Sequence, residues 1–225
     1  MQSPLYSLVI GNKAWSSWSL RSWLLLTRFG LPFEEIAVPL RRPDTPERIR
    51  AHSPSGAVPA LKHGDLVIWD SLAIAEYLAE RHPEHAMWPQ DATARALARS
   101  VSAEMHSGFA AMRRELPMDL LNIHPTPELS ERARADIGRV LEIWRFCLGR
   151  SGGPFLFGAF SIADAMFAPV VTRLRSYGIT PEQFGDDGTA TRYGLAIWSL
   201  DAMRAWEDGA RSELVAQLPN AGSFG

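Results

Sequence analysis

The segment from residue 56 to residue 80 constrains the fold of this chain more than any other, because two short apolar runs lead directly into a helical pattern. Pro59 opens the first run, and Gly64-Asp65 separates it from the second, at residues 66–69. A glycine and an aspartate between two apolar runs favour a β-hairpin. Apolar side chains with helical spacing follow at Leu72, Ala75, Leu78 and Ala79. The segment therefore predicts a hairpin followed by an amphipathic helix.

The residues that flank this hairpin have two interpretations. Proline has no N–H to donate to a strand ladder, so Pro59 belongs at the start of a strand or on an edge, and it is a candidate for a cis peptide bond. A cis bond would leave the backbone of Val58 free to pair with an extended ligand. Asp70 and Ser71 stand where the helix begins. They either cap the helix or offer a hydroxyl and free N–H groups to a carboxylate.

The chain before the hairpin alternates between strand and helix patterns. An apolar run at residues 5–10 predicts a strand, and a serine-rich turn then leads into a buried helix that Gly30 and Pro32 terminate. A second strand is expected at residues 33–38 and a short helix at residues 47–51. This order predicts a small α/β layer with a right-handed βαβ crossover.

The chain after residue 89 has alanine-rich helical patterns and no further strand pattern. Pro83 and Pro89 break the preceding helix, so we expect one domain at residues 1–83 and a second at residues 89–225. Ser161 and Asp164 form a variant of the capping box, for which we predict a structural role. Helices are expected at residues 92–121, at 126–148, from Ser161 onward and at 192–207, with a loose tail at 219–225.

Composition excludes several classes of function. The 225-residue chain carries a net charge of −2, which gives no electrostatic footprint for nucleic acid or an anionic membrane. Cys147 is the only cysteine, so no internal disulfide and no cysteine cluster for structural zinc can form. The first residues lack a signal-peptide pattern, and no stretch is apolar for the ~20 residues that a membrane span needs. These features predict a cytoplasmic protein.

Together these patterns resemble the cytosolic glutathione transferase family over essentially the whole chain. Three local matches carry the resemblance: Ser16-Ser17-Trp18-Ser19 with Arg21, Val58-Pro59 before Asp70-Ser71, and Ser161 to Asp164. The first is similar to the serine-serine-cysteine pattern of the zeta class, which includes maleylacetoacetate isomerases. The resemblance implies an α/β plus all-α fold, with a thioredoxin-like βαβ-αββα domain followed by an all-helical domain that carries the electrophile site. It also implies a homodimer.

The resemblance implies that glutathione is the co-substrate and assigns residues to it. Val58 and Pro59 would pair with its cysteinyl backbone as an added strand does. Asp70 and Ser71 would hold the ammonium and carboxylate of its glutamyl end, and Trp18 is counted among the glutathione-binding residues.

Catalysis in this family requires a thiolate, because a thiol with a pKa of ~8.5 is mostly protonated at neutral pH. A hydroxyl beside the sulfur and the positive end of the first helix would both stabilise the anion. By resemblance Ser16 is the first candidate for this hydroxyl and Ser17 the second. One of the two serines would then simply cap the helix.

The small electrophile would bind between the domains. Trp15, His106, Phe109 and Arg113 are the candidate residues, and the alternative for the Met and Phe stripe around them is a place in the core. Arg21 is expected to make a structural ion pair, and neither Arg173 nor Arg175 is assigned to the site. No metal is expected.

Two functions follow from these patterns. The first is a glutathione transferase that conjugates the thiolate to a small electrophile, or isomerises a double bond as maleylacetoacetate isomerases do. The alternative is a non-catalytic glutathione-binding or interaction module of the same fold. Trp18 keeps the alternative open, because it stands where the zeta pattern has cysteine and so removes any chemistry that needs that thiol.

Overall fold

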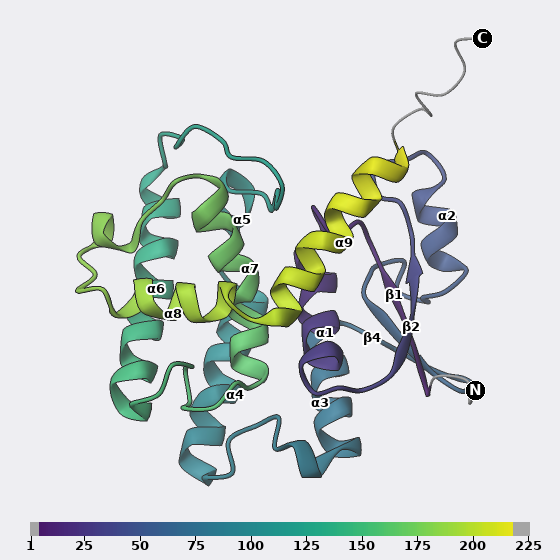
Figure 1. The fold of residues 1–225 in the computed structure, drawn as a ribbon, viewed down its shortest axis with the longest axis horizontal. Coiled ribbons are helices and arrows are strands. Elements are labelled where there is room, and N and C mark those ends of the chain that lie inside the picture. The colour runs from purple at the N-terminus through teal and green to yellow at the C-terminus, as the bar shows by residue number, and fades with distance from the viewer. Residues whose placement is uncertain (1–4, 218–225) are drawn as a thin grey trace.

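The computed structural model describes residues 5–217, which form a sheet-containing part and a helical part that pack against each other (Figure 1). The expected tail at residues 219–225 lies outside the described residues. No helix within residues 5–217 has the length and hydropathy that a membrane span requires.

The sheet has four strands, β1 (Tyr6–Ile10), β2 (Phe33–Ala37), β3 (Ala60–His63) and β4 (Leu66–Trp69), in the order β2-β1-β3-β4. β1 and β2 are parallel, as the predicted βαβ unit requires, and β3 runs antiparallel to both β1 and β4. The hairpin turns at Gly64, whose φ of 58° is readily adopted only by glycine. β4 is left as an open edge of the sheet.

Three helices belong to this part, namely α1 (Ser17–Arg28), α2 (Thr45–Arg50) and α3 (Ser71–Arg81). α1 and α3 pack together and against the sheet through a core that includes Leu24, Leu61 and Leu78. A 3₁₀ turn, η1 (Pro83–His85), then leads to the helical part.

The helical part contains α4 (Ala92–Ser107), α5 (Ala110–Glu115), α6 (Glu131–Ser151), α7 (Ile162–Ser176), the 3₁₀ turn η2 (Pro181–Phe184), α8 (Thr189–Trp198) and α9 (Asp201–Gln217). α7 is its central helix, since every residue except Arg175 is buried and the helix packs against both α1 and α4. The Ser161–Asp164 capping box forms at its start, as predicted. α9 returns to lie beside α1 (Figure 1). The predicted fold class is therefore confirmed.

Several predicted helix boundaries were wrong. The helix expected at residues 92–121 ends at Ser107, because Phe109 adopts a left-handed φ of 62° and a new helix begins after it. The helix expected from residue 126 begins at Glu131, where Ser130 provides the N-cap. The helix expected at 192–207 is two helices, which are separated around Ser199 and Leu200.

Candidate functional site

Three loops meet at one edge of the sheet. Val9 pairs with Ala60, and Ala60 pairs with Trp69, so the carboxyl ends of β1 and β4 flank the amino end of β3. The residues that continue from these strand ends are the loop at 11–16, the Val58-Pro59 pair and the Asp70-Ser71 pair. The Val58-Pro59 peptide is cis. Topology thus brings together all three sequence segments that were assigned to glutathione.

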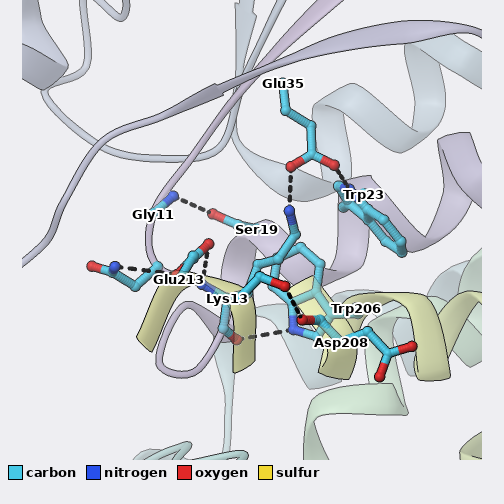
Figure 2. A network of polar contacts seen from close by, with 10 residues as sticks. Gly11, Lys13, Ser19, Trp23, Glu35, Trp206, Asp208 and Glu213 are labelled. Atoms are coloured by element: carbon cyan, nitrogen blue, oxygen red, sulfur yellow. Dashed lines mark hydrogen bonds and ion pairs between the residues drawn. The ribbon is translucent and has the colours of Figure 1, made fainter. Parts of the chain in front are cut away.

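The loop between β1 and α1 is held on two sides by buried contacts of Lys13 (Figure 2). Its ammonium group pairs with Glu35 of β2, and its backbone N–H donates to Glu213 of α9 at 3.0 Å. Trp206 of α9 donates from its indole to the carbonyl of Lys13 at 2.9 Å. The last helix therefore fixes the loop that presents Ser16.

The two candidate serines have different environments, although both are buried. Ser16 is the N-cap of α1, accepts a hydrogen bond from the N–H of Ser19 at 3.3 Å, and donates to the hydroxyl of Ser19 at 2.7 Å. Ser17 accepts a hydrogen bond from Nη2 of Arg173 at 3.0 Å. Ser16 thus sits at the positive end of the helix, whereas Ser17 connects α1 to α7.

Arg21 links α1 to the start of α3. It is fully buried, and its Nη1 lies 3.4 Å from the hydroxyl of Ser71. Its Nε and Nη2 have no hydrogen-bond partner among residues 5–217, and no carboxylate there lies close enough for an ion pair. The structural ion pair expected for Arg21 is therefore not formed. Buried donors without partners are rare in proteins, so these two nitrogens are candidates to bind a polar ligand.

Trp18 lies at the centre of the predicted site residues. The guanidinium groups of Arg21 and Arg113 lie 4.3 and 5.0 Å from its ring centroid, within the range of cation–π contacts. The ring of His106 packs edge-on against it at 5.3 Å, and Nε2 of His106 lies 2.9 Å from Oδ2 of Asp70. Asp70 also caps α3 through hydrogen bonds from two backbone N–H groups. One connected set of contacts therefore joins α1, α3, α4 and α5.

The electrostatics of this region are set by three arginines. Burial lowers the pKa of Arg21 well below its ordinary value, and the charges of Arg113 and Arg173 lower it further, against the opposing effect of Asp70. Burial also lowers the pKa of Arg113, and burial together with Arg113 lowers the pKa of Arg173 to about 10. Two buried guanidinium groups, Arg21 and Arg173, and the half-buried Arg113 therefore form a cationic region that favours the binding of an anion.

Two predicted residues lie apart from this set. Trp15 packs under Arg41, whose guanidinium is 4.6 Å from its ring, in a small hollow of about 60 Å³ next to α9. Phe109 is buried in the hydrophobic core, in agreement with the alternative stated for it. Val58, which stays at the sheet edge with Pro59, is half-buried and packs against the small core cluster of Val9, Val38, Ile49 and Ala60.

Sequence reasoning did not assign Arg173 to the site. The available signal was a charged residue within a largely apolar helix. An arginine is seldom fully buried without a polar partner, so such a residue is expected to contact a polar group or a ligand. Arg175, two residues further along, points elsewhere and lies 4.0 Å from the ring of Trp198.

Comparison with protein-family models gives two matches. The model described as the glutathione S-transferase N-terminal domain matches residues 15–81, and the model of the C-terminal domain matches residues 127–211. The first model therefore corresponds to the sheet-containing part of the fold, and the second to the helical part.

Similar proteins carry consistent names. Glutathione S-transferase 1 of Dianthus caryophyllus is 45% identical over 95 residues, which are 41% of this chain and 40% of that protein. Maleylacetoacetate isomerase of Rattus norvegicus is 25% identical over 90% of this chain and 92% of its own length. A glutathione transferase homologue from Burkholderia, solved with bound glutathione, superposes with a TM-score of 0.71 and 26% identity, covering 93% of this chain and 100% of its own.

Proposed function

The chain belongs to the glutathione S-transferase family, and on that basis we propose that it converts glutathione to its thiolate and directs the thiolate to a small electrophile. The observation that carries the proposal is the meeting of the Ser16 loop, Val58-Pro59 and Asp70-Ser71 at one sheet edge beside unpartnered donors of Arg21. These are the elements needed to bind a short peptide with two charged ends.

Glutathione would bind as an extended strand along this edge. The backbone of Val58 would pair with its cysteinyl residue, since β3 begins only at Ala60 and the backbone of Val58 lies outside the ladder. At the glutamyl end, Ser71 and the free nitrogens of Arg21 would hold the carboxylate, and Asp70 would hold the ammonium group. Trp18 would line the same end of the pocket.

Ser16 would stabilise the thiolate. Its hydroxyl proton now goes to Ser19, so binding of glutathione would redirect that proton to the sulfur. The N-terminus of α1 adds a positive potential at the same place. A decrease of two units in the thiol pKa corresponds to about 2.7 kcal/mol. Ser17 would act instead by holding Arg173 against α1.

The electrophile would be an anion bound beside the thiolate by Arg113 and Arg173, with His106 as a further polar contact. In conjugation the thiolate attacks an electrophilic carbon and a leaving group departs with the electron pair, or a proton is added. In isomerisation the thiolate adds to a conjugated double bond, the resulting single bond rotates, and loss of the thiolate restores the double bond. Relatives named maleylacetoacetate isomerase favour the second reaction.

The remaining assignments concern the whole molecule. We place the glutathione-binding domain at residues 1–83 and the electrophile-binding domain at residues 89–225. We propose a cytoplasmic location and a homodimeric state. The homodimer is supported by Leu66 and Trp69 on the open edge strand, which are each about half exposed, at 50% and 47%. Apolar side chains on an open sheet edge favour association.

Two measurements test this function. The first is retention of the protein on immobilised glutathione, and the second is turnover of a chromogenic electrophile and of a cis-configured unsaturated dicarboxylate. Retention with turnover of either compound supports it. Retention without turnover would favour the non-catalytic alternative, and absence of retention would contradict the glutathione site itself.

A further inference from the structure

A second cluster of chemically capable side chains lies in the linker between the two parts of the chain. His82, Glu84 and His85 place three possible metal-ligand atoms within 4.8 Å of one another. We propose that these residues bind one divalent transition-metal ion of the Zn²⁺ type. The site is separate from the glutathione site and does not depend on the function proposed above.

The local backbone sets the arrangement. His82 is the C-cap of α3, and Pro83 begins the 3₁₀ turn η1. The N–H of His85 donates to the carbonyl of His82 at 3.1 Å. Residues three apart in such a turn lie on the same side of it, which directs both imidazoles to one point.

The distances between the possible ligand atoms fit tetrahedral coordination. Nδ1 of His82 lies 3.3 Å from Oε1 of Glu84, and Nε2 of His85 lies 3.8 Å from the same oxygen. Ligands about 2.0–2.1 Å from a tetrahedral Zn²⁺ lie about 3.3 Å apart. All three atoms lie within 4.8 Å of one another, so binding requires the side chain of His85 to move towards the other two. The exposed Glu84 leaves the fourth position open to water.

The other nitrogen of His82 is already held by a buried partner. Nε2 of His82 lies 2.8 Å from the hydroxyl of Tyr6, whose side chain is 1% exposed. In the metal-bound form Nε2–H would donate to this hydroxyl, and the lone pair of Nδ1, which otherwise faces Oε1 of Glu84, would be directed at the ion. Contacts of this kind fix the tautomer and ring orientation of metal-binding histidines.

The chemistry of the donor set selects the class of ion. Two imidazoles and one carboxylate suit Zn²⁺, and also Co²⁺ and Ni²⁺, whereas Mg²⁺ and Ca²⁺ prefer oxygen ligands alone. Since His82 is the C-cap of α3 and Glu84 and His85 lie in η1, a bound ion would fix the linker to the end of α3. We therefore expect the ion to raise thermal stability.

The test uses the full chain without an affinity tag, stripped with a chelator and titrated calorimetrically with ZnCl₂. We expect one Zn²⁺ per chain and a visible Co²⁺ absorption band of tetrahedral type. His85→Ala and Glu84→Gln should each weaken binding at least tenfold, and Glu84→Gln alters only an exposed side chain. His124→Ala is the matched control, because His124 also pairs with a carboxylate, Asp119 at 2.9 Å.

Unchanged binding in His124→Ala together with the two losses supports the site. The proposal is overturned if the wild type does not bind Zn²⁺, or if the Glu84→Gln and His85→Ala variants bind it as tightly as the wild type does. It is also overturned if His124→Ala loses as much affinity as those two variants.

Discussion

Arg173 donates a hydrogen bond to the hydroxyl of Ser17 at 3.0 Å, across 156 positions of sequence. The same guanidinium also donates to the carbonyl of Leu116 in the segment after α5. One buried side chain thus connects the helical part to the first turn of α1. The cation contacts the residue next to Ser16 and is held there by neutral groups, which leaves its charge available to an anionic ligand.

Removing this charge tests the proposed substrate class. We expect Arg173→Met to lower kcat/KM by about 10- to 100-fold for an electrophile with a carboxylate, equivalent to about 1.4–2.7 kcal/mol. For a neutral electrophile the decrease should be less than about threefold on the same scale. Steady-state kinetics with the two electrophiles measure the difference.

Arg175→Met provides the control, because Arg175 lies on the same helix but packs on Trp198. Arg175→Met should leave kcat/KM near the wild-type value for both the carboxylate-bearing and the neutral electrophile. Equal losses for the two electrophiles in Arg173→Met would indicate a purely structural role for Arg173.

The assignment of the two serines is tested by the absorbance of bound thiolate. Ser16→Ala should raise the pKa of bound glutathione towards its ordinary value and change its Kd by less than about threefold, since the thiol makes a small part of the binding surface. Ser17→Ala should leave this pKa closer to the wild-type value. It should instead reduce the preference for a carboxylate-bearing electrophile that we attribute to Arg173. A raised thiol pKa in Ser17→Ala alone would transfer the role to Ser17.

The elements of the site that depend on neighbours in sequence could be predicted. Pro59 and Asp70 stand at the ends of a hairpin, so local turn and cap patterns placed them on the same sheet edge. Arg173 could not be located in this way, because its position beside Ser17 depends on how α7 packs against α1. The break at Gly108 was missed for a similar reason, since apolar spacing continues through it.

Gly108, the C-cap of α4, is required by a close backbone contact with the last turn of that helix. A Cβ at this position would lie 2.8 Å from the carbonyl oxygen of Glu104. The carbonyl of Gly108 also accepts a hydrogen bond from Nε of Arg113 at 3.0 Å, so the break positions a residue of the candidate site. Gly108→Ala should therefore destabilise the protein by about 1–3 kcal/mol and weaken binding of the electrophile.

Gly138 offers the matched control, because it lies within α6 and a Cβ there would meet no atom within 4 Å. Gly138→Ala should stabilise the protein by about 0.5–1 kcal/mol, through the higher helix propensity of alanine. Urea unfolding of the two variants gives both values. A stable Gly108→Ala variant would show that the contact with Glu104 relaxes freely.

The buried capping residue Asp164 should make stability depend on pH. Burial raises its pKa to about 6, although hydrogen bonds from Leu156 and Ser161 oppose that effect. Between about pH 4 and pH 6 the folded chain therefore retains a proton that the unfolded chain releases. This stabilising contribution is complete below the ordinary pKa and is lost as the pH rises through 6. A shift of about two units corresponds to roughly 3 kcal/mol.

Asp164→Asn removes this titration, because an amide carries no charge at any of these values of pH. The variant should be less stable overall, since one amide oxygen cannot replace both carboxylate oxygens that now accept from Leu156 and Ser161. The advantage of the wild type over the variant should nevertheless shrink as the pH is raised from 4 to 7. Urea unfolding of both proteins at each pH measures this difference. A constant difference, or one that grows with pH, would mean that Asp164 is already ionised in the folded chain at pH 4.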